Sequence, residues 1–139
     1  MRSGRLVSVL VAAGLLVACG PSGPTEETPE HAVQRHINAA KSGDVSALRS
    51  GSCGALATAI GAHSDDEVRD EFATLYDVGP DTLSTDSKAA GERRTVTGFY
   101  TNVADLEIAF TVEDHDGWKV CEIRRGNGIF GRLPAPFER

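Results

Sequence analysis

The 139-residue chain has 20 acidic and 14 basic residues, a formal net charge of −6, and 40% of its residues are hydrophobic. This balance disfavours nucleic-acid binding, because proteins that bind phosphate backbones need clustered cations, and the only basic pairs here are Arg93-Arg94 and Arg124-Arg125. The length is sufficient for one domain with its own core and too short for two.

The first 18 residues have the pattern of an export signal. Two arginines precede an apolar run over residues 6–18, which is shorter than the roughly 20 residues that a membrane-spanning helix needs. At the end of this run, Leu16-Val17-Ala18-Cys19 resembles the lipobox of bacterial lipoproteins at every position. The resemblance implies cleavage before Cys19, a diacylglyceryl group on its thiol, and a location on the extracytoplasmic face of the cell membrane. The alternative is an ordinary secretory signal with Cys19 at the cleavage site by chance.

Residues 20–27 are predicted to form a flexible tether after the lipidated Cys19, because they contain two prolines, two glycines and no apolar side chain that could pack. Removal of residues 1–18 leaves 12 basic against 20 acidic residues, a formal charge of −8. Anionic lipid repels a chain with this negative charge, so we expect the membrane affinity to come from the two acyl chains of the anchor. Residues 28–139 should form a single globular domain.

Cys53 and Cys121 are the two cysteines that remain once Cys19 carries the lipid. Outside the reducing cytoplasm, we predict that they pair in a disulfide. The alternative is two buried free thiols. A metal site is disfavoured, because no histidine lies at ligand spacing from either cysteine along the sequence.

Helical patterns occupy the first half of the domain. Thr28 and Pro29 favour the start of a helix that ends before Gly43, with its apolar residues on one face. Asp44 is a suitable N-cap for a second helix, which continues through Leu48 and is broken by Gly51. We assign Asp44 this structural role.

Two more helices are predicted before the pattern changes. Residues 53–60 have the spacing of a short helical segment. The sequence Ser64-Asp65-Asp66-Glu67 is a capping box, and the helix that it begins is expected to continue to Gly79-Pro80. Its core-facing stripe consists of Val68, Phe72, Leu75 and Tyr76.

The sequence pattern of the second half of the domain predicts β-strands. Apolar and polar residues alternate from Leu106 to Glu113, a turn follows over residues 114–117, and residues 118–124 form the next strand. Residues 93–101 should pair with the Leu106 strand, and a weaker strand is expected over residues 82–87. Helices followed by short-turn strands predict an α+β domain, with an antiparallel meander of three to four strands covered on one face by helices.

This order resembles the nuclear transport factor two-like superfamily over residues 28–125, and most closely the small exported lipoproteins of actinobacteria that carry such a domain. The resemblance rests on the helix junction Ala39-Ala40-Lys41-Ser42-Gly43-Asp44, on Leu48 in the second helix, and on Asp116-Gly117-Trp118-Lys119-Val120. It implies a curved sheet that wraps the first helix to form a cone. It also implies that Cys53 and Cys121 face each other across the layers.

In this superfamily the cone often holds a small apolar ligand, and in ketosteroid isomerase and its relatives it is an active site. The residues expected to line such a pocket are Tyr76, Tyr100 and His36, which borders the apolar stripe of the first helix. The alternative for His36 is a core-edge histidine, and for a buried tyrosine it is a hydrogen bond to a backbone carbonyl. His63 and His115 fall in predicted loops beside acidic residues and are expected to be solvated.

No catalytic residue and no cofactor is predicted. The chain lacks a G-x-S-x-G elbow, a Walker loop and a G-x-G-x-x-G motif. The apolar tail over residues 129–139 is broken by prolines, and we expect it either to pack over the cone mouth or to form a partner-binding strip. The sequence therefore favours a lipid-anchored, non-enzymatic module that binds a small apolar ligand or a protein. The alternatives are a ketosteroid-isomerase-like enzyme and a structural surface lipoprotein without a ligand.

Overall fold

The computed structural model describes residues 27–86, 92–102, 106–127, 131–133 and 135–138. The predicted export signal, the predicted lipidation site Cys19 and residues 20–26 of the predicted tether lie outside the described residues. The described elements are α1 (Pro29–Ser42), α2 (Val45–Ser50), α3 (Gly54–Gly61), α4 (Asp65–Leu75), β1 (Thr82–Thr85), β2 (Arg93–Phe99), β3 (Glu107–Asp114), β4 (Trp118–Asn127) and β5 (Gly131–Leu133).

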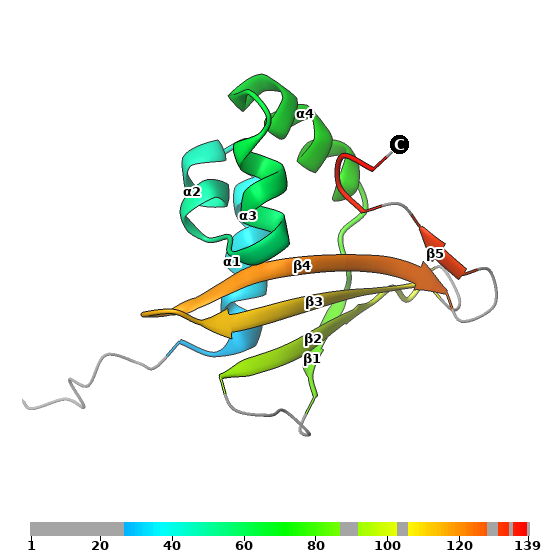
Figure 1. The fold of residues 1–139 in the computed structure, drawn as a ribbon. Coiled ribbons are helices and arrows are strands. Elements are labelled where there is room, and N and C mark those ends of the chain that lie inside the picture. Colours follow the sequence, from blue (N-terminus) through cyan, green and yellow to red (C-terminus); the bar gives the residue numbers. More distant parts are fainter. Residues whose placement is uncertain (1–26, 87–91, 103–105, 128–130, 134, 139) are drawn as a thin grey trace, which may run out of the picture.

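The described strands form one antiparallel sheet in the order β1-β2-β3-β4-β5. Figure 1 shows the curved sheet, with α2, α3 and α4 gathered on one side and α1 crossing the strands. Helix α1 contacts β1 to β4, and α3 contacts β4. The predicted α+β class, with helices first and an antiparallel meander second, is therefore confirmed.

The capping residues set the helix boundaries as predicted at three positions. The Thr28 hydroxyl accepts a hydrogen bond from the backbone N–H of His31, and Gly43 ends α1 in the left-handed conformation with φ of 70°. The Ser64 hydroxyl and the Glu67 carboxylate complete both hydrogen bonds of the capping box of α4. These local signals depend only on neighbouring residues.

The end of α4 differs from the prediction. The helix ends at Leu75, before the expected stop at Gly79-Pro80. Tyr76 has left the helical conformation, with φ of −113° and ψ of 28°, and its side chain is buried in the core, where its hydroxyl lies 2.8 Å from Nε2 of His36. A tertiary contact therefore coincides with the end of this helix.

A β-bulge interrupts the alternation that the sequence suggests for β3 and β4. Thr111 pairs with Glu122, but the next residue, Val112, pairs with Val120, so Cys121 is the extra residue on β4. Thr111, which the alternation placed on the outer face, is buried. The short strand β5, which pairs with the end of β4, was not predicted.

The core lies between the helices and the sheet. Its three largest fully buried side chains come from α4, from the turn after it and from β3: Phe72, Tyr76 and Phe110. Gly98 on β2 passes close to this layer, because a Cβ atom there would lie 2.8 Å from Pro80 and 2.9 Å from Ile108. Only a residue without a side chain fits this position without local movement.

Candidate functional site

A disulfide joins Cys53 and Cys121, as the sequence predicted. Backbone pairing brings the two residues together: the N–H of Cys53 donates to the carbonyl of Val120, and the N–H of Val120 donates to the carbonyl of Gly51, both at 2.9 Å. The bulge on β4 lies at the same place, directly beside the chain that leads into α3. The disulfide therefore links the helical layer to the sheet where hydrogen bonds already hold them.

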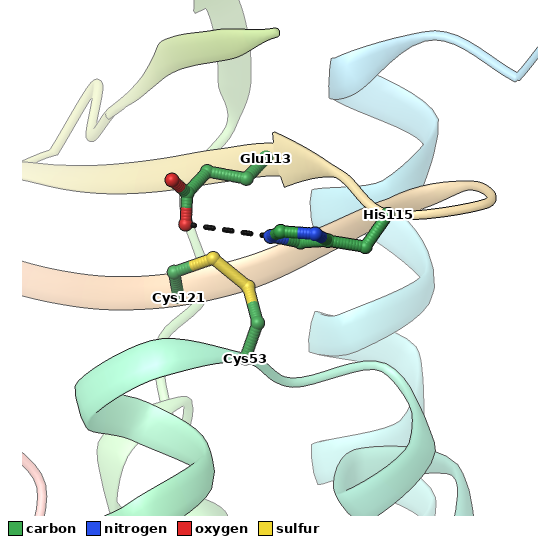
Figure 2. Close-up of side chains that lie close together, drawn as sticks. All are labelled: Cys53, Glu113, His115 and Cys121. Atoms are coloured by element: carbon green, nitrogen blue, oxygen red, sulfur yellow. Dashed lines mark ion pairs between the residues drawn. A yellow bond between two sulfur atoms is a disulfide. The ribbon is translucent and has the colours of Figure 1, made fainter.

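Two further polar side chains lie beside this disulfide, as Figure 2 shows. Glu113 belongs to the end of β3 and His115 to the turn before β4, and Nε2 of His115 lies 3.7 Å from Oε2 of Glu113. One potential ligand atom from each of the four residues lies within 4.8 Å of the other three. We call this group the Cys–Glu–His cluster; it consists of Cys53, Glu113, His115 and Cys121.

The sequence analysis missed this arrangement. It found no histidine at ligand spacing from the cysteines. His115 is exposed in the turn, as predicted, but folding of the β3–β4 hairpin also brings it next to both cysteines. The turn over residues 114–117 contained a usable signal, because it pairs Glu113 with Lys119 and so makes Cys121 a diagonal neighbour of Glu113.

Glu113 is held as a carboxylate. Nε and a terminal nitrogen of Arg93 donate to Oε1 of Glu113 at 3.2 and 2.8 Å. The hydrogen bond from Arg93 is the largest cause of a pKa of Glu113 below its ordinary value, and the charge of His115 contributes in the same direction. Arg93 engages Oε1, so Oε2 is the oxygen that faces His115.

The predicted pocket residues His36 and Tyr76 meet in the core instead of lining a described cavity. His36 is 5% exposed and Tyr76 1%, and Nε2 of His36 lies 2.8 Å from the Tyr76 hydroxyl oxygen. The rings of Phe72 and Phe110 pack edge-on against the imidazole, with centroids at 5.5 and 6.1 Å. Nδ1 of His36 has no hydrogen-bond partner among the described residues.

This burial shifts the ionisation of the aromatic cluster. Desolvation lowers the pKa of His36 to about 3 and raises the pKa of Tyr76 well above its ordinary value. Tyr100, the third predicted pocket residue, is partly buried against the same core, and desolvation raises its pKa too. His36 therefore stays neutral at physiological pH.

The predicted capping role of Asp44 is confirmed by the hydrogen bond from the N–H of Ala47, at 3.0 Å.

An apolar pocket lies between α3, β4 and the C-terminal segment over residues 135–138. Its volume is about 320 Å³. Its walls are mainly apolar, from Ala55, Leu56, Ala59, Ile123, Pro136 and Phe137, and Glu122 and Glu138 add carboxylates. A second, more polar cavity of about 470 Å³ lies along α4 and shares Phe137 with the first.

The C-terminal segment forms a wall of this pocket because it folds back onto the helices. The ring of Phe137 stacks on His63 with a centroid distance of 4.1 Å and lies edge-on to Phe72 at 6.0 Å. The N–H of Phe137 donates to the carboxylate of Glu71 at 2.9 Å, and Pro136 is buried. The described part of the tail therefore packs against the domain, and composition alone did not show which surface it would cover.

The chain matches no protein-family model, no curated protein and no solved structure. Within the part of the chain that the structure describes, no helix is long and apolar enough to cross a bilayer. The case for a function therefore depends on the residues themselves.

Proposed function

We propose that this chain is a lipid-anchored extracytoplasmic module, with a nuclear transport factor two-like domain, that binds a small apolar ligand and catalyses no reaction. The lipobox-like segment that ends in Cys19 supports the anchor, and the order of helices before a curved antiparallel sheet supports the domain assignment. In this proposal residues 20–27 link Cys19 to the domain, and export through the N-terminal signal places the domain on the outer side of the membrane.

The observation that carries the binding proposal is the apolar pocket between α3, β4 and residues 135–138. Its volume of about 320 Å³ is at the lower end of the range for ligand pockets, about 300–1,000 Å³. Apolar walls with a few polar groups favour burial of a hydrocarbon body, and the side chains of Glu122 and Glu138 place negative charge at the pocket. We therefore expect a neutral or cationic small apolar molecule rather than an anion.

The polar groups of the core favour binding over isomerase-like catalysis. Proton abstraction of the ketosteroid isomerase kind needs a carboxylate base in an apolar site. The carboxylates of the apolar pocket, Glu122 and Glu138, are exposed and so lack the apolar surroundings of such a base. The buried polar side chains of the described core are His36, Ser52 and Thr111, and none of them is a carboxylate. His36 lies in a packed aromatic cluster and not on the wall of the apolar pocket.

Fluorescence titration with the neutral apolar dye N-phenylnaphthylamine tests the proposal. Ala55 is exposed and lines the pocket, so Ala55→Trp should fill the pocket and weaken dye binding by tenfold or more. Thr58 is also exposed on α3 but does not line the pocket, and Thr58→Trp should bind the dye as the unmodified chain does. Saturable binding that both variants retain would place the ligand elsewhere, and the absence of saturable binding would favour a structural lipoprotein.

A further inference from the structure

The donor atoms of the Cys–Glu–His cluster are those that zinc prefers in proteins. Thiolate sulfur, imidazole nitrogen and carboxylate oxygen all bind Zn²⁺, and four of them complete a tetrahedral site. With bonds of about 2.0–2.3 Å, neighbouring ligands in such a site are about 3.3–3.8 Å apart. The four candidate atoms already lie within 4.8 Å of one another, so small side-chain rotations suffice once the two sulfurs are separate thiols.

Backbone hydrogen bonds, as well as the disulfide, hold this arrangement. Three ligands come from the β3–β4 hairpin, and the hydrogen bonds between residues 51–53 and Val120 hold the fourth, Cys53, against it. None of these contacts involves a sulfur atom, so we expect them to persist when the disulfide is reduced. The dithiol chain should then present the same four side chains to one point.

The charges also fit a divalent cation. Two thiolates and Glu113 carry three negative charges, Zn²⁺ carries two positive charges, and the guanidinium of Arg93 balances the remainder. Arg93 engages Oε1 of Glu113, which leaves Oε2 on the side of His115. Cys121 is buried whereas His115 is exposed, so a metal ion can reach the site from solvent.

We propose that the dithiol form of this chain binds one Zn²⁺ ion in the Cys–Glu–His cluster, and that formation of the disulfide abolishes the site. Binding releases one proton from each thiol, and His115 coordinates in its neutral form. When a small-molecule disulfide oxidises the zinc form, the two thiolates lose two electrons and form the Cys53–Cys121 bond. The oxidant accepts the two electrons and leaves as two thiolates, and Zn²⁺ is released.

The test uses the full chain with Cys19→Ser, so that Cys53 and Cys121 are its only cysteines. After reduction with a phosphine, calorimetric titration with Zn²⁺ should show one ion bound per chain, and the disulfide form should bind none at this site. Addition of oxidised glutathione to the zinc form should release the ion to a chromogenic indicator. Equal zinc affinity in the two redox forms, or no binding after reduction, would overturn the proposal.

Variants separate the four-ligand site from binding by thiols alone. His115→Ala and Glu113→Gln should each weaken zinc binding by at least about tenfold, since loss of an outer-shell partner alone costs 10–100-fold and a direct ligand contributes no less. His31→Ala, which removes an exposed histidine of α1, is the matched control and should bind normally. Unchanged affinity in both cluster variants would contradict the assignment.

If reduction unfolds the domain, circular dichroism still tests the proposal. Circular dichroism of the reduced chain should then recover its helical signal when Zn²⁺ is added, because metal binding contributes folding free energy. Cys53→Ser/Cys121→Ser, which lacks both sulfur ligands, should show no recovery. A reduced chain that stays unfolded in excess zinc would contradict the proposal.

Discussion

The buried His36 should make the domain less stable in mild acid. In the folded chain its imidazole lies among Phe72, Tyr76 and Phe110, and burial lowers its pKa to about 3. In the unfolded chain the same group returns to its ordinary pKa of 6.5. Between these two values the unfolded state binds a proton that the native state does not, so the stability falls as the pH falls from 6.5 towards 3.

The size of this effect follows from the two pKa values. Each pH unit below 6.5 should reduce the free energy of unfolding by about 1.4 kcal/mol, because the unfolded state gains one proton on this side chain. Lowering the pH from 7.5 to 5.0 should therefore cost about 2 kcal/mol. That is a large share of the roughly 5–15 kcal/mol that stabilises a typical domain.

Urea unfolding at a series of pH values measures the effect, and a variant isolates it. His36→Gln cannot titrate, so between pH 7.5 and 5.0 it should lose about 2 kcal/mol less than the unmodified chain, although it will be less stable at pH 7.5. His31→Gln changes an exposed histidine of α1 and should leave the pH dependence unchanged. Equal losses in His36→Gln and in the unmodified chain would refute a buried, neutral His36.

Three other variants test separate parts of the account. Gly98→Ala should reduce the free energy of unfolding by about 1–3 kcal/mol, because its Cβ would lie 2.9 Å from Ile108; an unchanged urea midpoint would contradict this close approach. Cys53→Ser/Cys121→Ser should lose about 4 kcal/mol in the same assay without added metal, since the disulfide closes a 68-residue separation. Cys19→Ala should move the protein out of the membrane fraction or leave it as unprocessed precursor, and normal processing with membrane retention would argue against the lipid anchor.

Local chemistry made several features predictable from the sequence. The caps at Thr28, Gly43 and Ser64 depend on residues within one turn of a helix, and all three lie where the sequence indicated. The β3–β4 hairpin followed from alternation around a tight turn. The pairing of Cys53 with Cys121 could be predicted from two points alone: they are the two cysteines left after Cys19, and the chain is expected outside the reducing cytoplasm.

The features that were not predicted depend on contacts between distant segments. The bulge that makes Cys121 the extra residue of β4 forms where the chain before α3 pairs with that strand, and no local pattern marks it. Likewise Phe137 covers His63 and Phe72 only because the tail returns across the helices. These contacts build the apolar pocket and the Cys–Glu–His cluster, so neither site could be predicted from the sequence. The pocket residue that the sequence did indicate, His36, lies in the core instead.

The central claim is that the domain carries a small apolar ligand in the pocket beside α3. Native mass spectrometry of the soluble domain, which begins at residue 20 and is purified from the protein's own host, tests it most directly. We predict one small molecule bound per chain, retained in Thr58→Trp and lost in Ala55→Trp. Only the bare protein mass in every preparation, or the same adduct on Ala55→Trp, would contradict the claim.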